Sequence, residues 1–252
     1  QDLANGFPYA SKKQKKKNKK LHWVVLLLTL VMLCGCAALG YFVFEIKEIK
    51  VEGSQRFSQE EVIAQSGVQL GQNLFLVSKS QVKTNIELQP YLHFERISYE
   101  LPGTIVLHVS EKTAYGAVYY DGRYAFIDEN GVVLQLSDQP NGVPLIEGFA
   151  PTAASLGAQI QGPTAYQLYA YGQIMPQLMA QSYADKIVEM DITQPAAVHI
   201  KTDTGMTIRM GSADNLDSKI NWLNTLMPRL IQEGKLTGTL DVTGEKGASY
   251  IP

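Results

Sequence analysis

The stretch LHFERISYELPGTIVLHV, residues 92–109, decides the fold of the first part of the chain. Apolar and polar residues alternate from Leu92 to Leu101 and again from Thr104 to Val109. Alternation with a period of two indicates a strand with one buried face, and Pro102-Gly103 between the two runs is a turn signal. The stretch therefore predicts a β-hairpin.

Two short helices are predicted before this hairpin. Ser58 and Glu61 have the spacing of a capping box, and Gly67 is a residue that ends helices. A second helix begins at Ser78 or Ser80 and runs to about residue 88.

An alternating run at residues 45–52 predicts one further strand ahead of the helices. The order over residues 45–112 is therefore strand, helix, helix, strand, strand.

Residues 113–252 predict a second α+β domain with an antiparallel sheet. Asp121-Gly122 and Asn130-Gly131 are hairpin turns between runs rich in Tyr, Val and Ile. One helix begins at Pro163 and is expected to kink at Pro176, and another is capped by Asp214-Asn215. Further extended segments are expected at residues 187–192, 197–201, 206–210, 240–242 and 248–251.

The N-terminal part predicts a single transmembrane helix. Residues 21–44, LHWVVLLLTLVMLCGCAALGYFVF, carry no Asp, Glu, Lys or Arg, and seven lysines lie among residues 11–20. A helix of this length rises roughly 36 Å, enough to cross a hydrocarbon core of about 30 Å. Lysines favour the cytoplasmic side, so we expect residues 1–20 to form a basic cytoplasmic tail and residues 45–252 to lie outside the membrane.

Two cleaved alternatives explain this run less well. The apolar core of a secretory signal has about 7 to 15 residues before a small-residue cleavage site. This run is longer and ends in Tyr41-Phe42-Val43-Phe44. Leu33-Cys34-Gly35-Cys36 crudely resembles the box before a lipidated cysteine, but eight apolar residues follow it.

Charge and cysteine content exclude several kinds of site from residues 45–252. The chain has 22 Lys and Arg and 24 Asp and Glu, of which residues 1–44 hold seven and one, so 15 basic and 23 acidic residues remain. This acidic balance argues against nucleic acid as a partner. The two cysteines, Cys34 and Cys36, lie in the apolar run, so the rest has no disulfide, thiol nucleophile or cysteine metal site.

Candidate catalytic residues lack the companions that catalysis requires. Ser80 and Lys83 have the S-x-x-K spacing of serine enzymes that act on cell-wall peptides, but no S-D-N or K-T-G motif accompanies them. His93, His108 and His199 fall in separate predicted strands without metal-ligand spacing. We therefore predict no catalytic residue, metal or cofactor.

Tyrosines concentrate in two places, around the 121–122 turn and on the helix after Pro163. Tyrosine suits contact surfaces because it is large and amphipathic. Alternating tyrosines also simply cover a sheet, so both interpretations stay open. The residues concerned are Tyr115, Tyr119, Tyr120, Tyr124, Tyr166, Tyr169 and Tyr171.

Several segments, in their order and spacing, resemble the FtsQ/DivIB family of bacterial cell-division proteins, whose first domain is a POTRA domain. The resemblance covers residue 44 to the C-terminus. Its segments are Ile49-Lys50-Val51-Glu52-Gly53, Leu70-Gly71-Gln72-Asn73-Leu74-Phe75, Leu101-Pro102-Gly103-Thr104-Ile105, Glu111-Lys112-Thr113-Ala114, residues 124–133 with an I-D-x-x-G-x-V pattern, and Val143-Pro144-Leu145-Ile146-Glu147-Gly148.

The resemblance implies a non-catalytic, single-pass scaffold of the divisome in the bacterial cell membrane, enriched at the septum. Such a protein supports septal peptidoglycan synthesis through contacts with small bitopic coiled-coil division proteins, FtsB/DivIC-like and FtsL-like. It implies no cofactor, nucleic acid or small-molecule substrate. Two alternatives remain, a membrane-anchored cell-wall hydrolase or transferase and an envelope-assembly POTRA module.

The resemblance also implies a partner contact on the last helix and the closing strands. Where the family often has Asp-Leu-Arg-Tyr, this chain has Asp241-Val242-Thr243-Gly244, which lacks the cationic and aromatic anchors of a hot spot. Strand addition needs only backbone, and if Val242 lies on an accepting edge, we expect Val242→Pro to block partner binding without unfolding the protein. The implied contact residues are Trp222, Pro228, Arg229, Asp241, Val242, Thr243, Gly244, Ala248, Ser249 and Tyr250.

Overall fold

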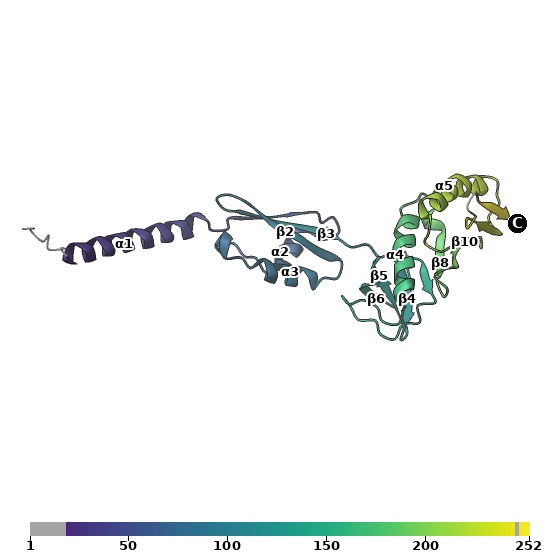
Figure 1. The fold of residues 1–252 in the computed structure, drawn as a ribbon, viewed down its shortest axis with the longest axis horizontal. Helices are drawn as coiled ribbons and strands as arrows, with labels where there is room; N and C mark the ends of the chain where they lie inside the picture. The colour runs from purple at the N-terminus through teal and green to yellow at the C-terminus, as the bar shows by residue number, and fades with distance from the viewer. Residues whose placement is uncertain (1–18, 245–246) are drawn as a thin grey trace, which may run out of the picture.

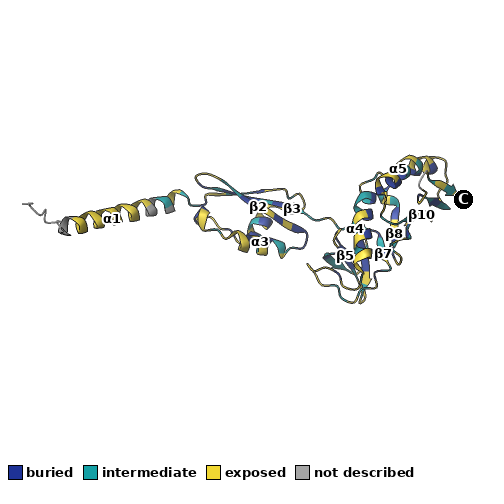
Figure 2. Cartoon of the chain, viewed as in Figure 1, coloured by how far each residue is buried: buried dark blue, intermediate teal, exposed yellow. Residues whose placement is uncertain are grey.

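The computed structural model describes residues 19–244 and 247–252, without the side chains of residues 19–21, 37–39 and 41. Most of the predicted basic tail lies outside the described residues. The first element is α1 (Lys19–Val43), and its described side chains up to Cys36 are exposed (Figure 2). Within the described part of the chain, no helix combines the length and the apolar character needed to cross a membrane.

The first domain confirms the predicted order of elements. It contains β1 (Glu48–Glu52), α2 (Gln59–Ser66), the short 3-10 helix η1 (Leu74–Leu76), α3 (Lys79–Glu87), β2 (Leu92–Glu100) and β3 (Thr104–Glu111). The strands form a sheet in the order β1-β3-β2, with β1 parallel to β3 and β2 antiparallel to it. Both helices pack their apolar residues against this sheet, as Val62 and Ile86 illustrate, each with none of its surface exposed (Figure 1).

Local signals set the helix boundaries in this domain. The Ser58 and Glu61 side chains form the predicted capping box at the start of α2, and Gly67 ends the helix with φ of 74°. Ser78, and not Ser80, is the N-cap of α3, since its hydroxyl accepts the backbone N–H of Gln81.

The second domain is a nine-stranded sheet in the order β12-β11-β10-β9-β8-β7-β4-β5-β6. Helices α4 (Ala165–Met179) and α5 (Leu216–Gln232) contribute apolar residues to its core (Figure 1). The strands are β4 (Gly116–Tyr120), β5 (Arg123–Ile127), β6 (Val133–Ser137), β7 (Leu145–Glu147), β8 (Ile187–Asp191), β9 (Val198–Thr202), β10 (Thr207–Gly211), β11 (Thr239–Asp241) and β12 (Ser249–Ile251), and a 3-10 helix, η2 (Ala184–Lys186), precedes β8.

The prediction of an antiparallel sheet is wrong, because the sheet is mixed. The pairs β4–β7, β7–β8 and β10–β11 are parallel. Helix α4 lies between β7 and β8 in the chain, and α5 lies between β10 and β11. A crossover helix returns the chain to the end of the sheet where the previous strand began, so the two strands that it joins run parallel.

The two long helices begin differently. Thr164 and Gln167 form a capping box at α4, so Pro163 precedes the N-cap, and the helix continues past Pro176 to Met179. Asn215 is the N-cap of α5, but it has φ of 51° and makes no side-chain cap bond, so the expected side-chain cap there is wrong.

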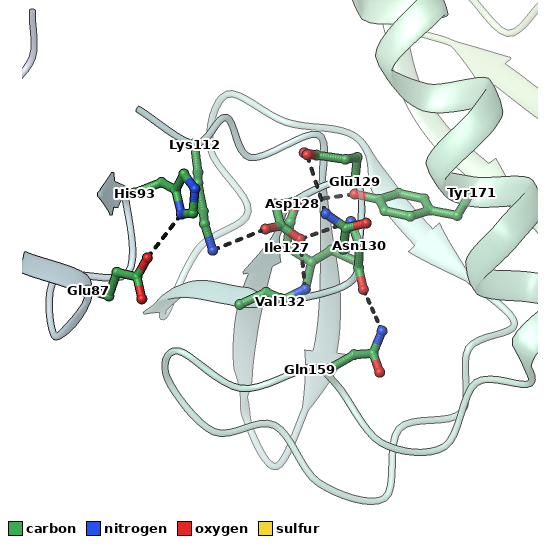
Figure 3. A network of polar contacts seen from close by, with 10 residues as sticks. All are labelled: Glu87, His93, Lys112, Ile127, Asp128, Glu129, Asn130, Val132, Gln159 and Tyr171. Carbon is green, nitrogen blue, oxygen red and sulfur yellow. Dashed lines mark hydrogen bonds and ion pairs between the residues drawn. The ribbon is translucent and has the colours of Figure 1, made fainter. Parts of the chain in front are cut away.

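The two domains meet through a buried carboxylate, Asp128, in the turn between β5 and β6 (Figure 3). Asp128 Oδ1 accepts the backbone N–H groups of Asn130 at 2.9 Å and Val132 at 2.8 Å. Its Oδ2 lies 3.7 Å from Nζ of Lys112, which follows β3 of the first domain. Tyr91 Oη donates to Gln135 Oε1 of β6 at 3.1 Å. The Asp128 carboxylate therefore closes a turn and, with the Tyr91–Gln135 hydrogen bond, joins the two domains.

Substitutions at Asp128 separate these two roles. Asp128→Ala leaves two backbone N–H groups without their acceptor, and we expect it to lower the free energy of unfolding by about 1–3 kcal/mol. Asp128→Asn keeps an Oδ1 acceptor and loses only the pairing with Lys112, so it retains most stability but broadens the distribution of distances between the domains. Urea denaturation measures the first effect, and electron-paramagnetic-resonance distances between spin labels on the two domains measure the second.

Asp138→Asn is the matched control, because the Arg123–Asp138 pair is exposed and lies within one domain. A distance distribution unchanged by Asp128→Asn would show that Lys112 does not hold the junction.

Candidate partner-binding surface

The nine-stranded sheet has two edge strands, β6 and β12, which differ in how far they are covered. The start of β6 is bonded to the loop at residues 157–158, since Val133 N donates to Ala158 O at 2.9 Å and Val133 O accepts Gly157 N at 2.8 Å. Tyr91 of the first domain contacts the same strand. Across residues 19–244 and 247–252, no strand pairs with the outer side of β12. The end of the molecule far from α1 therefore carries the open edge (Figure 1).

The pairing of β11 fixes which backbone groups of β12 point outward. Gly238 O accepts from Thr207 N at 2.9 Å and Val242 N donates to Arg209 O at 3.1 Å, so the even-numbered residues of β11 face β10. Neighbouring residues of a strand point their backbone groups to opposite sides, so Thr239 and Asp241 face β12. Their partners are Ile251 and Ser249.

Tyr250 is opposite Leu240, so its N–H and C=O point away from β11. It offers one backbone donor and one acceptor to an added strand.

The side chain of Tyr250 ties the edge strand to α5. It packs against the core cluster, and its Oη donates to Thr237 O at 2.9 Å. Lys235 Nζ lies 5.8 Å from the centre of its ring and 2.8 Å from Glu233 Oε2. Arg229 Nε lies 2.8 Å from the other oxygen of Glu233. A chain of charged and aromatic contacts therefore runs from α5 to the edge.

Glu233 is the common acceptor in this chain of contacts. The hydrogen bonds from Lys235 and Arg229, together with the charge of both, lower the pKa of Glu233 to about 2. Glu233 thus stays ionised at neutral pH and pairs with both cations, of which Lys235 lies against the Tyr250 ring.

The face of the sheet opposite α5 is polar at this end. Arg209 Nη1 lies 3.0 Å from Asp241 Oδ2, and Asp241 Oδ1 accepts from Thr243 N at 2.9 Å and from Thr243 Oγ1 at 2.6 Å. Burial alone would raise the pKa of Asp241, but these Thr243 bonds and the charges of Arg209 and His199 together lower it.

Val242 does not lie on an accepting edge, so the condition for the predicted effect of Val242→Pro is not met. Val242 has 0% of its surface exposed, and its N–H is bonded to Arg209 O, so Val242→Pro would break an internal bond of the sheet. The sequence predicts extended segments at residues 240–242 and 248–251 but does not show which of them forms the edge of the sheet. Their order in the sheet depends on where the α5 crossover returns the chain.

The other predicted contact residues divide into two groups. Trp222, Ala248 and Tyr250 are half-buried against the core, and Asp241 is half-buried on the opposite, polar face. The remaining ones, on α5, in the loop after β11 and on β12, are exposed: Pro228, Arg229, Thr243, Gly244 and Ser249.

Three residues of this surface were missed by sequence reasoning. Arg209 pairs with Asp241, Lys235 contacts Tyr250, and Ile251 has 53% of its surface exposed on the edge strand. A single exposed apolar residue such as Ile251 is a weak sequence signal of a contact surface. Arg209 and Lys235 can be assigned to this surface only when the order of the strands is known.

The residues considered for catalysis are engaged in local contacts. Ser80 Oγ lies 3.1 Å from Ser78 Oγ at the start of α3, and both Ser80 and Lys83 are exposed. His93 lies 3.1 Å from Glu87, and His108 Nε2 lies 2.7 Å from Ser98 Oγ. In the described ranges, no group of three His, Cys, Asp or Glu residues could hold a metal ion.

The tyrosines have mixed roles. Tyr119 and Tyr124 face each other across β4 and β5 with ring centres 5.2 Å apart. Tyr166 and Tyr169 are exposed on α4, whereas Tyr171 is buried and donates to Ile127 O at 3.1 Å. Burial raises the pKa of Tyr171 well above its ordinary value.

A pH-dependent contribution to stability is expected from Asp241. Because its folded pKa lies below the ordinary 3.8, the ionised group stabilises the fold above that value, and the contribution is lost as pH falls through the lowered pKa. Asp241→Asn keeps an Oδ1 acceptor for Thr243 and loses the Arg209 pair, so we expect a loss of about 0.2–1 kcal/mol at neutral pH. Urea denaturation over a pH series should show the difference from the unsubstituted protein shrinking below about pH 4. A constant difference at every pH would contradict this assignment.

Comparisons with known proteins match both domains. Residues 44–112 match the family described as "POTRA domain, FtsQ-type", and residues 117–243 match "Cell division protein FtsQ/DivIB, C-terminal". The chain is 23% identical over 237 residues to the cell division protein DivIB of Clostridium botulinum strain Hall, covering 93% of this chain and 91% of that protein.

Two other relatives come from different bacteria. DivIB of Clostridium acetobutylicum is 27% identical over 226 residues, covering 87% of each chain. The cell division protein FtsQ of Syntrophotalea carbinolica is 26% identical over 192 residues, covering 74% of this chain and 66% of that protein. The C-terminal family match spans half of the sequence, and the chain therefore belongs to the FtsQ/DivIB family of cell-division proteins.

Proposed function

We propose that this protein is a non-catalytic scaffold of the bacterial divisome that binds its partner by adding a strand to β12. The observation that carries the proposal is the open edge at Tyr250, whose backbone N–H and C=O point away from the sheet. An added strand would pair with these groups and extend the nine-stranded sheet by one. Family membership directs the choice of partner toward division proteins.

The partner is a small bitopic coiled-coil division protein, FtsB/DivIC-like, with an FtsL-like protein in the same complex. Such a protein presents a short extracytoplasmic segment that an edge strand accepts through its backbone. Lys235, beside Tyr250, and Arg229, which shares Glu233 with it, favour a segment with acidic side chains. Ile251, exposed on the opposite face, provides an apolar contact.

The membrane topology is type II, with the N-terminus in the cytoplasm and residues 45–252 outside at the division septum. Support comes from the sequence, since residues 21–44 carry no ionised side chain and lysines precede them. The protein then acts as a fixed support for partners of septal peptidoglycan synthesis, without performing chemistry itself.

Strand addition predicts different effects for two substitutions of Tyr250. Tyr250→Pro removes the outward N–H, and we expect it to weaken binding of the DivIC-like protein from the same bacterium by about tenfold. Tyr250→Ala removes the side chain but keeps the N–H, so it should weaken binding less. Affinity is measured with both full-length proteins in nanodiscs, with circular dichroism to verify folding.

Each outcome of this comparison has a distinct meaning. Equal weakening by both substitutions would favour a side-chain contact over strand addition, and unchanged affinity in both folded variants would exclude this edge. Ser80→Ala tests the alternative of a cell-wall hydrolase or transferase. Turnover of a cell-wall peptide that is lost in Ser80→Ala would replace the scaffold proposal.

A further inference from the structure

The chain passes from α1 into the first domain without a linker. Phe44 O accepts Leu74 N at 2.8 Å, Ile46 N donates to Gln72 O at 2.7 Å, and Gly71 N donates to Ile46 O at 2.9 Å. The β2–β3 turn is joined to the same segment, since Lys47 N donates to Gly103 O at 2.8 Å. Two loops, residues 70–77 and 101–103, are therefore bonded to the chain where it leaves α1.

These two loops expose large apolar side chains beside the end of α1. The four side chains, which we call the apolar collar, are 59–72% exposed: Leu70, Phe75, Leu76 and Leu101. The Phe75 ring lies 5.1 Å from that of Phe44 and 5.9 Å from that of Tyr99. The collar thus continues the apolar character of α1 into the first domain.

Charge is absent from the same loops. Residues 70–77, LGQNLFLV, and 101–103, LPG, contain no ionisable side chain, although Lys79 and Glu100 lie close to their ends. A surface loop of a domain in water has little reason to expose four large apolar residues without a charge among them. Aromatic residues at the level of the lipid headgroups are typical of membrane proteins.

We propose that the apolar collar inserts into the outer interface of the lipid bilayer and seats the first domain on the membrane. The occupant is lipid, because the backbone bonds to residues 44–47 keep both loops at the level where α1 would leave the hydrocarbon. The side chains would enter the boundary between headgroups and acyl chains by about 5–10 Å. This inference rests on the proposed anchoring by α1.

The opposite end of the first domain offers a matched control. Leu88, directly after α3, is 70% exposed, which is comparable to Leu76. It lies near the start of β2, at the end of the sheet that leads to the second domain, because β3 begins beside β1 near α1 and ends at Glu111. Leu76 and Leu88 therefore lie at opposite ends of the first domain but have nearly the same exposure.

Tryptophan fluorescence distinguishes the two ends. The full-length protein, whose two tryptophans are Trp23 and Trp222, is placed in vesicles of phosphatidylcholine and phosphatidylglycerol. Part of the phosphatidylcholine carries bromine in the upper acyl chain, which quenches nearby tryptophan. In a background that carries Trp23→Phe and Trp222→Phe, we expect emission from Leu76→Trp to shift to shorter wavelength and to be mostly quenched, and emission from Leu88→Trp to be unaffected.

A Leu76→Trp signal as insensitive to brominated lipid as that of Leu88→Trp would overturn the proposal. Leu101→Trp, from the other loop, repeats the test where the first variant folds poorly, and the same insensitivity there would overturn it. Failure of the anchor is seen separately, because it leaves Trp23 unquenched in a Trp222→Phe variant, where Trp23 is the one remaining tryptophan. Quenching of Trp23 with no quenching at Leu76→Trp would keep the anchor and reject the collar.

Discussion

A strand in a sheet either pairs on both sides or leaves a row of backbone groups without a partner, and the second domain is organised by this constraint. The α5 crossover places β11 parallel to β10, which uses the even-numbered backbone groups of β11. Only the backbone groups of the odd-numbered residues of β11 remain to pair with β12. The open edge and the orientation of Tyr250 thus follow from one parallel pairing in the interior of the sheet. A binding site built in this way depends on backbone geometry, which tolerates changes of side chain more readily than a pocket does.

Local patterns in the sequence were sufficient for most of the fold. The capping residues of α2, the 92–109 hairpin and the turns at Asp121-Gly122 and Asn130-Gly131 depend on residues close together in the chain. The parallel pairs could not be predicted in the same way, because they depend on where α4 and α5 return the chain. The short strand β7, with three residues and parallel neighbours on both sides, also gives too little alternation to be recognised.

The partner contact itself stays a prediction, and the structure shows only how its proposed residues are arranged. Residues of α5 and the closing strands do lie close together, as the contacts of Tyr250 and Lys235 indicate. Val242 is not an edge residue, which could not be predicted because strand order is a property of the whole sheet. Lys235 and Arg209 were missed for the same reason, since each acquires its role only from a neighbour distant in sequence or fixed by the fold.

With α1 anchored in the membrane as proposed, its direct joining to the first domain would fix the direction in which the second domain points within the membrane plane. Backbone hydrogen bonds at Phe44, Ile46 and Lys47 couple the helix to two loops, and Asp128 couples the first domain to the second. A turn of α1 about its own axis would therefore turn the distant edge strand through a similar azimuth. Neighbouring helices that contact one side of α1 would then determine how β12 is oriented about the axis of α1. A partner that contacts both α1 and β12 must then match the fixed angle, about the axis of α1, between these two surfaces. A partner that matches only one of the two surfaces could not make both contacts at once.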